Sequence, residues 1–341
     1  DYVKALADDV NWKEYIPAKF ILPQNMDVVV GRQCDFWVQD TIENPRNMPY
    51  IFNVPSGMTD YGNGHMRITA SSAGTSSLKL VTLKEDFVGE FADYDNIVST
   101  QSINIRKVAR TGGSGSFNVL IVGDSLVAYG NGANPVETYK LLAEDADVTI
   151  NQIGLVTDVV DGVTYRHEGH GGWSYATFIA SGSPFVFNGT LSFSQYMQTN
   201  FPALSGIDLC VVLLGTNDNR DEVVANAKTF IDQLVADYPN CKVAIGVPAY
   251  GIPVNGTTTS TERNIKTACK RLIEAFDNGT YHANVTCIGH GCWIDRVNDY
   301  PHNEVDATPY SSAKIINYTN NIHPSTQGYK QWGRAVYCKI R

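Results

Sequence analysis

This 341-residue sequence has no excess of positive charge, no long apolar run and no paired cysteine motif. Its 26 lysines and arginines are outnumbered by 35 acidic residues, and the net charge of −9 argues against nucleic acid or an anionic membrane as the main partner. No apolar run approaches the roughly 18 residues that span a bilayer, and no cleavable signal pattern opens the chain, so we expect no membrane insertion. The remaining composition, 43% hydrophobic and 18% charged, is typical of a globular protein.

The seven cysteines are an odd number, and none of them belongs to a CxxC pair. None has histidine or cysteine partners at zinc-ligand spacing, so the sequence predicts no zinc site. Cys210, Cys269 and Cys338 lie in apolar stretches, where a free cysteine packs as a small core residue. Cys287 and Cys292 could bridge or stay free, and the sequence leaves both alternatives open.

The first hundred residues contain no helical periodicity of useful length. They hold short segments rich in valine, isoleucine and threonine, separated by Gly, Asn, Ser and Pro: residues 26–30, 34–42, 65–70, 77–83 and 101–108. At this length we expect two domains. We predict an N-terminal arm at 1–18, a small antiparallel β-sandwich domain at 19–109, a flexible Gly/Ser linker at 110–116, and a second domain at 117–341.

The second domain alternates apolar strand-like segments with amphipathic helices. The predicted strands are residues 118–122, 148–153, 209–214, 242–247 and 285–288. Between the later strands apolar residues recur at helical spacing, as Ala227, Ile231 and Leu234 do, and Ser325 can cap a final helix. This pattern predicts an α/β fold with a parallel sheet covered on both faces, and active sites form at the carboxyl edge of such a sheet.

Four polar or glycine-rich segments follow predicted strands or precede the last helix. Ser125 lies in "VLIVGDSLVAYG", just past the first strand of the second domain. We expect "EGHGGWSY" (168–175) to be a loop after the second strand, "LLGTNDN" (213–219) leaves the third, and "NNIHPSTQGY" (320–329) precedes the final helix. Because parallel strands end at one edge of their sheet, these segments are expected to meet there.

Together the segments hold the groups that acyl transfer requires, namely a nucleophile, a base and donors for the developing oxyanion. We predict Ser125 as the nucleophile and His323 as the base. The backbone N–H groups of Ser125 and Gly172 and the side-chain amide of Asn217 would form the oxyanion hole. Glycine suits position 172 because a residue without Cβ lets a substrate oxygen approach its N–H closely.

Some residues of these segments also have purely structural interpretations. Gly169 and Gly171 compete with Gly172 for the oxyanion role, and Asp124 most simply braces the turn before the serine. Trp173 either packs within its loop or offers a platform to a sugar. The cluster of His167, Glu168 and His170 suggests a metal site, but no two of them share a helical face, so we predict no metal and no cofactor.

In this order, Gly-Asp-Ser-Leu, the later glycine, Gly-Thr-Asn-Asp and the C-terminal His-Pro resemble the SGNH (GDSL) hydrolase family, over residues 117–341. The resemblance implies a flavodoxin-like three-layer α/β/α fold and ester hydrolysis through an acyl-serine. It assigns Ser125 as nucleophile, Gly172 and Asn217 to the oxyanion hole, and His323 as base. "HEGHGGWSY" is also similar to the "EGHxGW" loop of the carbohydrate-esterase branch, which usually removes acetyl groups from glycans. An N-terminal β domain also occurs among such esterases.

Position 320 departs from the family pattern, which usually has Asp three residues before the histidine. Asn320 can orient His323 through its carbonyl oxygen, but if the amide is turned round it donates and favours the wrong ring tautomer. In the serine-protease triad the change from Asp to Asn lowers kcat by about 10⁴. We favour support of His323 by a neutral acceptor, either the Asn320 carbonyl oxygen or a backbone carbonyl, with Asp295 as a substitute acid or loss of catalysis as the alternatives.

The function predicted from the sequence is a serine esterase that hydrolyses O-acyl groups, foremost O-acetyl groups, of a carbohydrate. Its partner would be an acylated carbohydrate, without nucleic acid or membrane insertion, and the β domain could attach it to a larger assembly. We expect a soluble protein that is secreted, at the cell surface or virion-associated. The alternatives are a non-catalytic glycan-binding protein or adhesin on the same fold, and a short-chain lipase or acyl thioesterase.

Overall fold

The computed structural model describes residues 20–38, 41, 49–62, 64–83, 97–111, 114–128, 134–145, 147–248, 260–295, 298–306, 314–320 and 322–341. The predicted arm at 1–18 lies outside these residues. Among the helices of the described ranges, none combines the length and the apolar character needed to cross a membrane.

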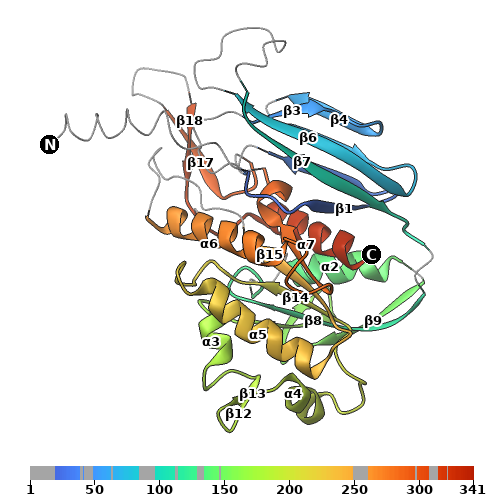
Figure 1. Ribbon diagram of the computed structural model, residues 1–341, viewed down its shortest axis with the longest axis vertical. Coiled ribbons are helices and arrows are strands. Elements are labelled where there is room, and N and C mark those ends of the chain that lie inside the picture. The colour runs from blue at the N-terminus through green and yellow to red at the C-terminus, as the bar shows by residue number, and fades with distance from the viewer. Residues whose placement is uncertain are drawn as a thin grey trace, which may run out of the picture.

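A parallel sheet forms the centre of the C-terminal part of the chain (Figure 1). Five of its strands run parallel in the spatial order β9-β8-β14-β15-β16, which is the 2-1-3-4-5 order of flavodoxin-like folds. Their bounds are β8 (Gly115–Gly123), β9 (Val148–Ile153), β14 (Leu209–Leu213), β15 (Lys242–Val247) and β16 (Val285–Gly289). The predicted α/β class with a parallel sheet is therefore confirmed.

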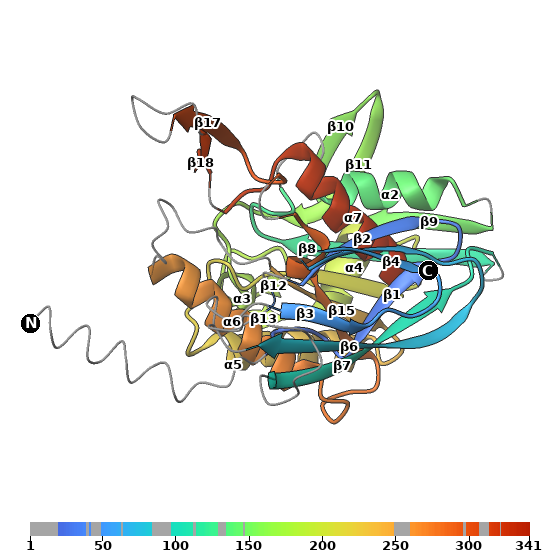
Figure 2. The same ribbon diagram turned by 90° about the horizontal axis from the view of Figure 1, so that it is seen from above.

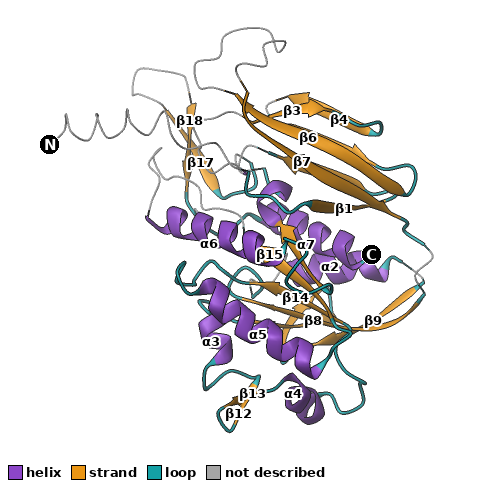
Figure 3. Ribbon diagram, viewed as in Figure 1, coloured by secondary structure: helices purple, strands orange, loops and turns teal. Residues whose placement is uncertain are grey.

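Helices cover both faces of this sheet (Figure 3). Alternate residues of β8 are apolar on both faces of the sheet, so both faces need a cover. Val119 and Ile121 lie in the core under α2 and α7. Leu120 and Val122 lie in the core under α3, α5 and α6. The helices are α2 (Asn134–Ala143), α3 (Tyr175–Ile179), α4 (Phe193–Asn200), α5 (Val223–Asp237), α6 (Ser260–Phe276) and α7 (Thr326–Ile340). Ser325 caps α7 as predicted, since its hydroxyl accepts from the N–H of Gly328.

A hairpin that the strand prediction missed lies between β9 and α3. It consists of β10 (Val156–Val160) and β11 (Val163–Gly169), joined by Asp161 and Gly162, which both have positive φ. Asp-Gly between alternating apolar residues is a strong hairpin signal. The prediction missed it because it assigned only strands that alternate with helices. Strand β11 pairs with the end of β8, so Glu168 and Gly169 belong to the sheet rather than to a loop. Figure 2 shows the hairpin extending past α2.

The short elements that remain in the C-terminal part are two hairpins and a 3₁₀ turn. They are β12 (Val186–Phe187) with β13 (Thr190–Leu191), β17 (His302–Asp306) with β18 (Lys314–Tyr318), and η3 (His290–Trp293). The β17–β18 hairpin comes directly before the segment that holds His323.

The N-terminal part forms two sheets, of order β1-β7-β6-β3 and β2-β5-β4. Their strands are β1 (Asn25–Val29), β2 (Gln33–Trp37), β3 (Pro49–Asn53), β4 (Met58–Gly62), β5 (His65–Thr69), β6 (Gly74–Leu83) and β7 (Ile97–Val108). The all-antiparallel expectation is wrong for one pair, because β1 runs parallel to β7. Strands so far apart in sequence can pair in either direction, since no tight turn fixes their sense.

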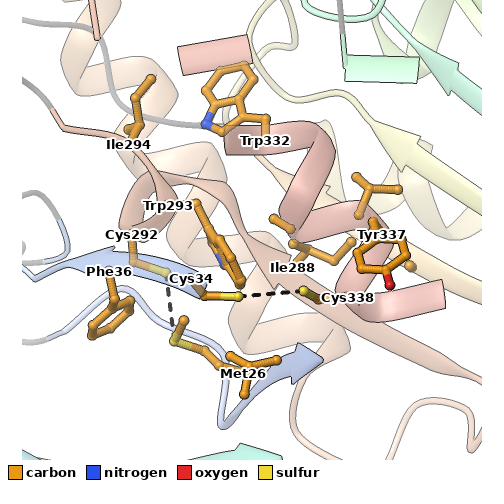
Figure 4. Close-up of a cluster of buried hydrophobic side chains, with 14 of the residues drawn as sticks. Met26, Cys34, Phe36, Ile288, Cys292, Trp293, Ile294, Trp332, Tyr337 and Cys338 are labelled. Carbon is orange, nitrogen blue, oxygen red and sulfur yellow. Dashed lines mark hydrogen bonds between the residues drawn. The ribbon is translucent and has the colours of Figure 1, made fainter. Parts of the chain in front are cut away.

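The N-terminal sheets share a core with the rest of the molecule. Phe36 and Ile105 from the two sheets belong to one hydrophobic cluster with Trp293 of η3 and Trp332 of α7 (Figure 4). The predicted linker is shorter than expected, because β8 begins at Gly115 and pairs there with β9. The division into two domains remains a prediction, but the two parts are joined by buried apolar contacts.

Polar and sulfur contacts cross the same boundary. The Cys34 Sγ of β2 lies 3.8 Å from the Cys338 Sγ of α7 (Figure 4). The Lys339 Nζ lies 2.9 Å from the Asp27 Oδ2 of β1. All seven cysteines are buried and unbridged, including Cys287 and Cys292. The cysteines therefore pack as core residues.

A buried carboxylate also helps to join the N-terminal sheets to the C-terminal part. The Asp145 side chain is fully buried and accepts from the Arg110 Nε at 2.7 Å and from the Tyr337 hydroxyl at 2.8 Å. The Arg341 Nε lies 3.4 Å from the same carboxylate. A buried charge needs such partners, because leaving it unpaired costs several kcal/mol (about 3–5).

Candidate active site

Ser125 lies in a tight turn at the carboxyl end of β8, in the middle of the sheet, and it is partly exposed. The turn is closed by the N–H groups of Val127 and Ala128, which donate to the Asp124 carbonyl. Gly123 is required before it, because a Cβ there would approach the carbonyl oxygen of Leu213 to 2.8 Å. Packing against the neighbouring strand therefore explains why this strand ends in glycine.

The structure brings His323 to Ser125 across 198 residues of sequence. The His323 Nε2 lies 2.8 Å from the Ser125 Oγ, which is hydrogen-bonding distance. His323 is itself partly exposed. It lies two residues before Ser325, whose side chain caps the N-terminus of α7. The two side chains thus have the geometry that a nucleophile and its base require.

Asn320 occupies the other side of the His323 ring. Its Oδ1 accepts from the backbone N–H groups of Ile322 and His323, at 3.0 and 2.9 Å, while its Nδ2 lies 3.3 Å from the His323 Nδ1. The carboxylate of Asp295, the alternative acid, accepts from the Asn298 side chain at 2.6 Å. Burial lowers the pKa of His323 below its ordinary value. Asn320 thus presents its amide nitrogen, not its oxygen, to Nδ1.

Asn217 leaves β14 and connects the serine turn with the glycine-rich loop. Its Nδ2 donates to the Asp124 Oδ2 at 3.2 Å and to the Trp173 carbonyl at 3.1 Å. The other Asp124 oxygen accepts from the Leu126 N–H at 2.9 Å. Burial raises the pKa of Asp124 to about 7. Asp124 does brace the turn, and it also holds the Asn217 amide at the turn that contains Ser125.

The three glycines after β11 differ in what requires them. Gly172 has φ +80°, a backbone conformation that favours glycine, and a Cβ there would meet no atom within 4 Å. A Cβ on Gly169 would lie 2.8 Å from the Ala128 backbone nitrogen, which makes Gly169 a packing residue. Gly171 has neither constraint. These contacts are consistent with the assignment of the oxyanion role to Gly172.

The buried carboxylate of Glu168 stabilises the glycine-rich loop through His170, a role that the sequence did not indicate. Glu168 is fully buried and accepts from the Leu155 N–H at 2.7 Å, the Tyr196 hydroxyl at 2.6 Å and the His170 Nε2 at 2.9 Å. The His170 ring stacks on Trp173 with centroids 4.2 Å apart. One face of the indole is therefore covered by protein, and the partly exposed ring packs within its loop.

His167, Glu168 and His170, whose cluster in the sequence suggests a metal site, form hydrogen bonds with other side chains. The His167 Nε2 lies 3.1 Å from the Asp158 Oδ2, on the β10–β11 hairpin, whereas His170 pairs with Glu168. Burial lowers the pKa of His167, which favours the neutral ring. Within the described ranges no three such side chains gather as a metal cluster.

A second buried carboxylate, Asp218, fixes the helix that follows the loop. Its Oδ1 accepts from the Tyr175 N–H, the first residue of α3, at 3.0 Å. Burial raises the pKa of Asp218 to about 6. Tyr175 is fully buried and packs in the core rather than lining the site.

Comparison with known proteins places this arrangement in a family. Residues 119–336 match the model of the GDSL-like lipase/acylhydrolase family. Among solved structures, a family 3 carbohydrate esterase of Clostridium thermocellum is similar at 18% identity and TM-score 0.44, covering 65% of this chain and 94% of that one. A family 3 carbohydrate esterase of Talaromyces cellulolyticus is similar at 16% identity and TM-score 0.43, covering 66% and 96%. No curated protein matches the sequence. Since the family model spans more than half of the chain, this protein belongs to the GDSL-like lipase/acylhydrolase family and is a carboxylic ester hydrolase.

Proposed function

We propose that the protein removes small acyl groups, foremost acetyl, from the hydroxyls of a carbohydrate through an acyl-Ser125 intermediate. The observation that carries the proposal is the 2.8 Å contact between the Ser125 Oγ and the His323 Nε2 at the carboxyl edge of the sheet. Both side chains are partly exposed, so an ester carbonyl can reach the serine.

In the first step the Ser125 Oγ attacks the ester carbonyl and its proton passes to the His323 Nε2. The N–H groups of Ser125 and Gly172 and the Asn217 amide would donate to the oxyanion, and Asn217 would exchange its bond to the Trp173 carbonyl for one to the oxyanion. His323 then protonates the departing sugar oxygen, and the C–O bond of the ester breaks. A water molecule, deprotonated by the same ring, releases the acid from Ser125.

The surroundings of Ser125 support a small acyl group on a polar leaving group. The Ser125 hydroxyl is hydrogen-bonded to His323, Asn217 is bonded to the adjacent Asp124, and the neighbouring loop offers a His170–Trp173 ring pair. Polar groups close to the reacting carbon favour an acetyl over a long alkyl chain, because a long chain would lie against them without apolar contact. The similarity of "HEGHGGWSY" to the carbohydrate-esterase loop supports a sugar.

One observation favours the second candidate function, a glycan-binding protein without turnover. The Asn320 amide nitrogen, rather than an acidic oxygen, faces the His323 ring. A site of this kind could retain a sugar ester and cleave it very slowly.

The test compares the wild type with Ser125→Ala on 4-nitrophenyl acetate, 4-nitrophenyl octanoate and an O-acetylated oligosaccharide. We expect release of acetate from the oligosaccharide, loss of activity in the variant, and a steep fall from acetyl to octanoyl esters. Equal or better turnover of the octanoyl ester would contradict the carbohydrate assignment and favour a lipase. Saturable binding of the oligosaccharide without acetate release would establish the non-catalytic alternative.

A further inference from the structure

The orientation of the Asn320 side chain follows from its backbone partners. Two N–H groups, those of Ile322 and His323, point at one end of the amide, at 3.0 and 2.9 Å. Only the carbonyl oxygen can accept from them, because the NH₂ group would face two donors without an acceptor. The turn therefore fixes the oxygen on the backbone side and leaves the NH₂ group on the side of the ring.

The NH₂ group in turn restricts the His323 ring. An amide nitrogen donates hydrogen bonds and does not accept them, so at 3.3 Å the ring nitrogen Nδ1 must be the acceptor. In a neutral imidazole one nitrogen accepts and the other carries the proton. A ring that accepts at Nδ1 therefore carries its proton on Nε2, the atom 2.8 Å from the Ser125 Oγ.

We propose that Asn320 is a positioning residue that restrains catalysis, because it holds neutral His323 with its proton on Nε2. In that tautomer the ring donates to the Ser125 Oγ, and it can take the serine proton only after its own proton has moved from Nε2 to Nδ1. The imidazolium form is disfavoured as well, because its N–H at Nδ1 would face the N–H of the Asn320 amide, and neither group could accept a hydrogen bond. An Asp at this position would keep one oxygen for the backbone N–H groups and present the other to a proton on Nδ1.

The site is therefore an assembled acyl-transfer site with a weakened base. The effect on ester turnover rests on the proposed function, whereas the tautomer is a property of the free protein. The corresponding change in a serine protease, Asp to Asn, lowers kcat by about 10⁴ for the same tautomeric reason, which sets the upper limit of the restraint.

The first measurement is the tautomer of His323 by ¹⁵N NMR of histidine-labelled protein, at about pH 8, where an ordinary ring is neutral. The chain has seven histidines, and His323→Gln identifies the signal by its loss. We expect the proton on Nε2 in the wild type and on Nδ1 in Asn320→Asp. A wild-type ring protonated on Nδ1 would overturn the proposal.

The second measurement is the rate at which a fluorophosphonate labels Ser125. In this reaction the Oγ–P bond forms, the P–F bond breaks, fluoride leaves and the serine proton goes to His323. We expect Asn320→Asp to raise the rate at least about tenfold, because the base then faces the serine with a lone pair. Asn317→Asp makes the same change at an exposed position of β18 and should leave the rate unaltered.

Asn320→Ser provides a second variant if the aspartate disturbs the fold. Serine retains an oxygen for the backbone N–H groups and removes the amide donor, so labelling should again be faster than in the wild type. A folded Asn320→Asp or Asn320→Ser whose labelling rate stays at or below that of the wild type would overturn the proposal. Both readouts work without an ester substrate, so a failure of the carbohydrate-esterase function would be seen separately.

Discussion

The two halves of the active site are built in different ways. The half around Ser125 belongs to the central sheet, where Gly123 packs against β14 and the Asp124 carboxylate accepts from Leu126 and Asn217. The half around His323 lies on the chain between β18 and α7, where a single asparagine, Asn320, contacts both the backbone and the ring. The serine half contains the residues expected to donate, and the histidine half has an amide in place of the expected acid.

This difference locates the limit on catalysis in the histidine half. The serine half holds the proposed nucleophile and the proposed oxyanion donors, next to the ends of buried strands. The histidine half supplies the ring at 2.8 Å but orients it through an amide nitrogen. Substitutions of Ser125 or Asn217 should therefore lower the rate of ester hydrolysis, whereas a substitution of Asn320 should raise it.

The largest effect is expected from the serine half. Ser125→Ala removes the nucleophile and should lower kcat/KM for 4-nitrophenyl acetate by at least about 10³-fold. The thermal unfolding midpoint serves as the control and should stay close to that of the wild type, because Ser125 is only partly buried. A variant that keeps most of its activity would place the nucleophile elsewhere.

A smaller loss is expected from the oxyanion donor. Asn217→Ala removes an amide that would stabilise the oxyanion, and such donors contribute about 10²–10³ in kcat. Steady-state kinetics should show a reduced kcat with little change in KM. An effect confined to KM would mean that Asn217 only holds the Trp173 carbonyl.

Buried carboxylates in the serine half should make stability depend on pH. The folded-state pKa of Asp218, about 6, lies above its ordinary value of 3.8, so this group's contribution to stability is greatest below pH 3.8 and is lost as the pH rises through 6. Asp218→Asn keeps an acceptor for the Tyr175 N–H and removes the charge. Urea unfolding should show the variant more stable than the wild type at pH 8, by about 1–3 kcal/mol, with no gain at pH 3.5. A gain of equal size at both pH values would contradict this cause.

The smallest effect is expected from Asp295. Its carboxylate is bonded to Asn298, and the Asn320 amide faces the ring, so Asp295→Asn should keep at least about a tenth of wild-type kcat. A loss beyond about a hundredfold, with the circular dichroism spectrum unchanged, would show that Asp295 is the acid of a rearranged triad and would remove the contrast between the two halves.

Much of the serine half could be predicted from the sequence, because local patterns determine it. The apolar run before Gly123 predicts a buried parallel strand, and such strands bring Ser125, the loop with Gly172, and Asn217 to one edge. The β10–β11 hairpin was missed although Asp161-Gly162 marks it. The direction of β1 beside β7 and the core shared between Phe36 and Trp332 depend on contacts distant in sequence, which no local pattern specifies.

The histidine half shows a different limit of sequence-based prediction. The sequence identified Asn320 as the departure from the family, and it allowed either end of the amide to face His323. The outcome depends on two backbone N–H groups, at Ile322 and His323, whose direction is a property of the folded turn. Support of the ring by a neutral acceptor was the favoured prediction and stays a prediction. At Asn320 the atom nearest the ring is the amide nitrogen rather than the carbonyl oxygen.

The covalent intermediate provides the most direct test of the acyl-Ser125 mechanism. The protein is mixed with 4-nitrophenyl acetate, quenched with acid within the first turnover and digested for mass spectrometry. We expect an acetyl group on Ser125 in the wild type, and a faster build-up of the same adduct in Asn320→Asp. Sustained ester hydrolysis without acetyl-Ser125, and undiminished in Ser125→Ala, would contradict it.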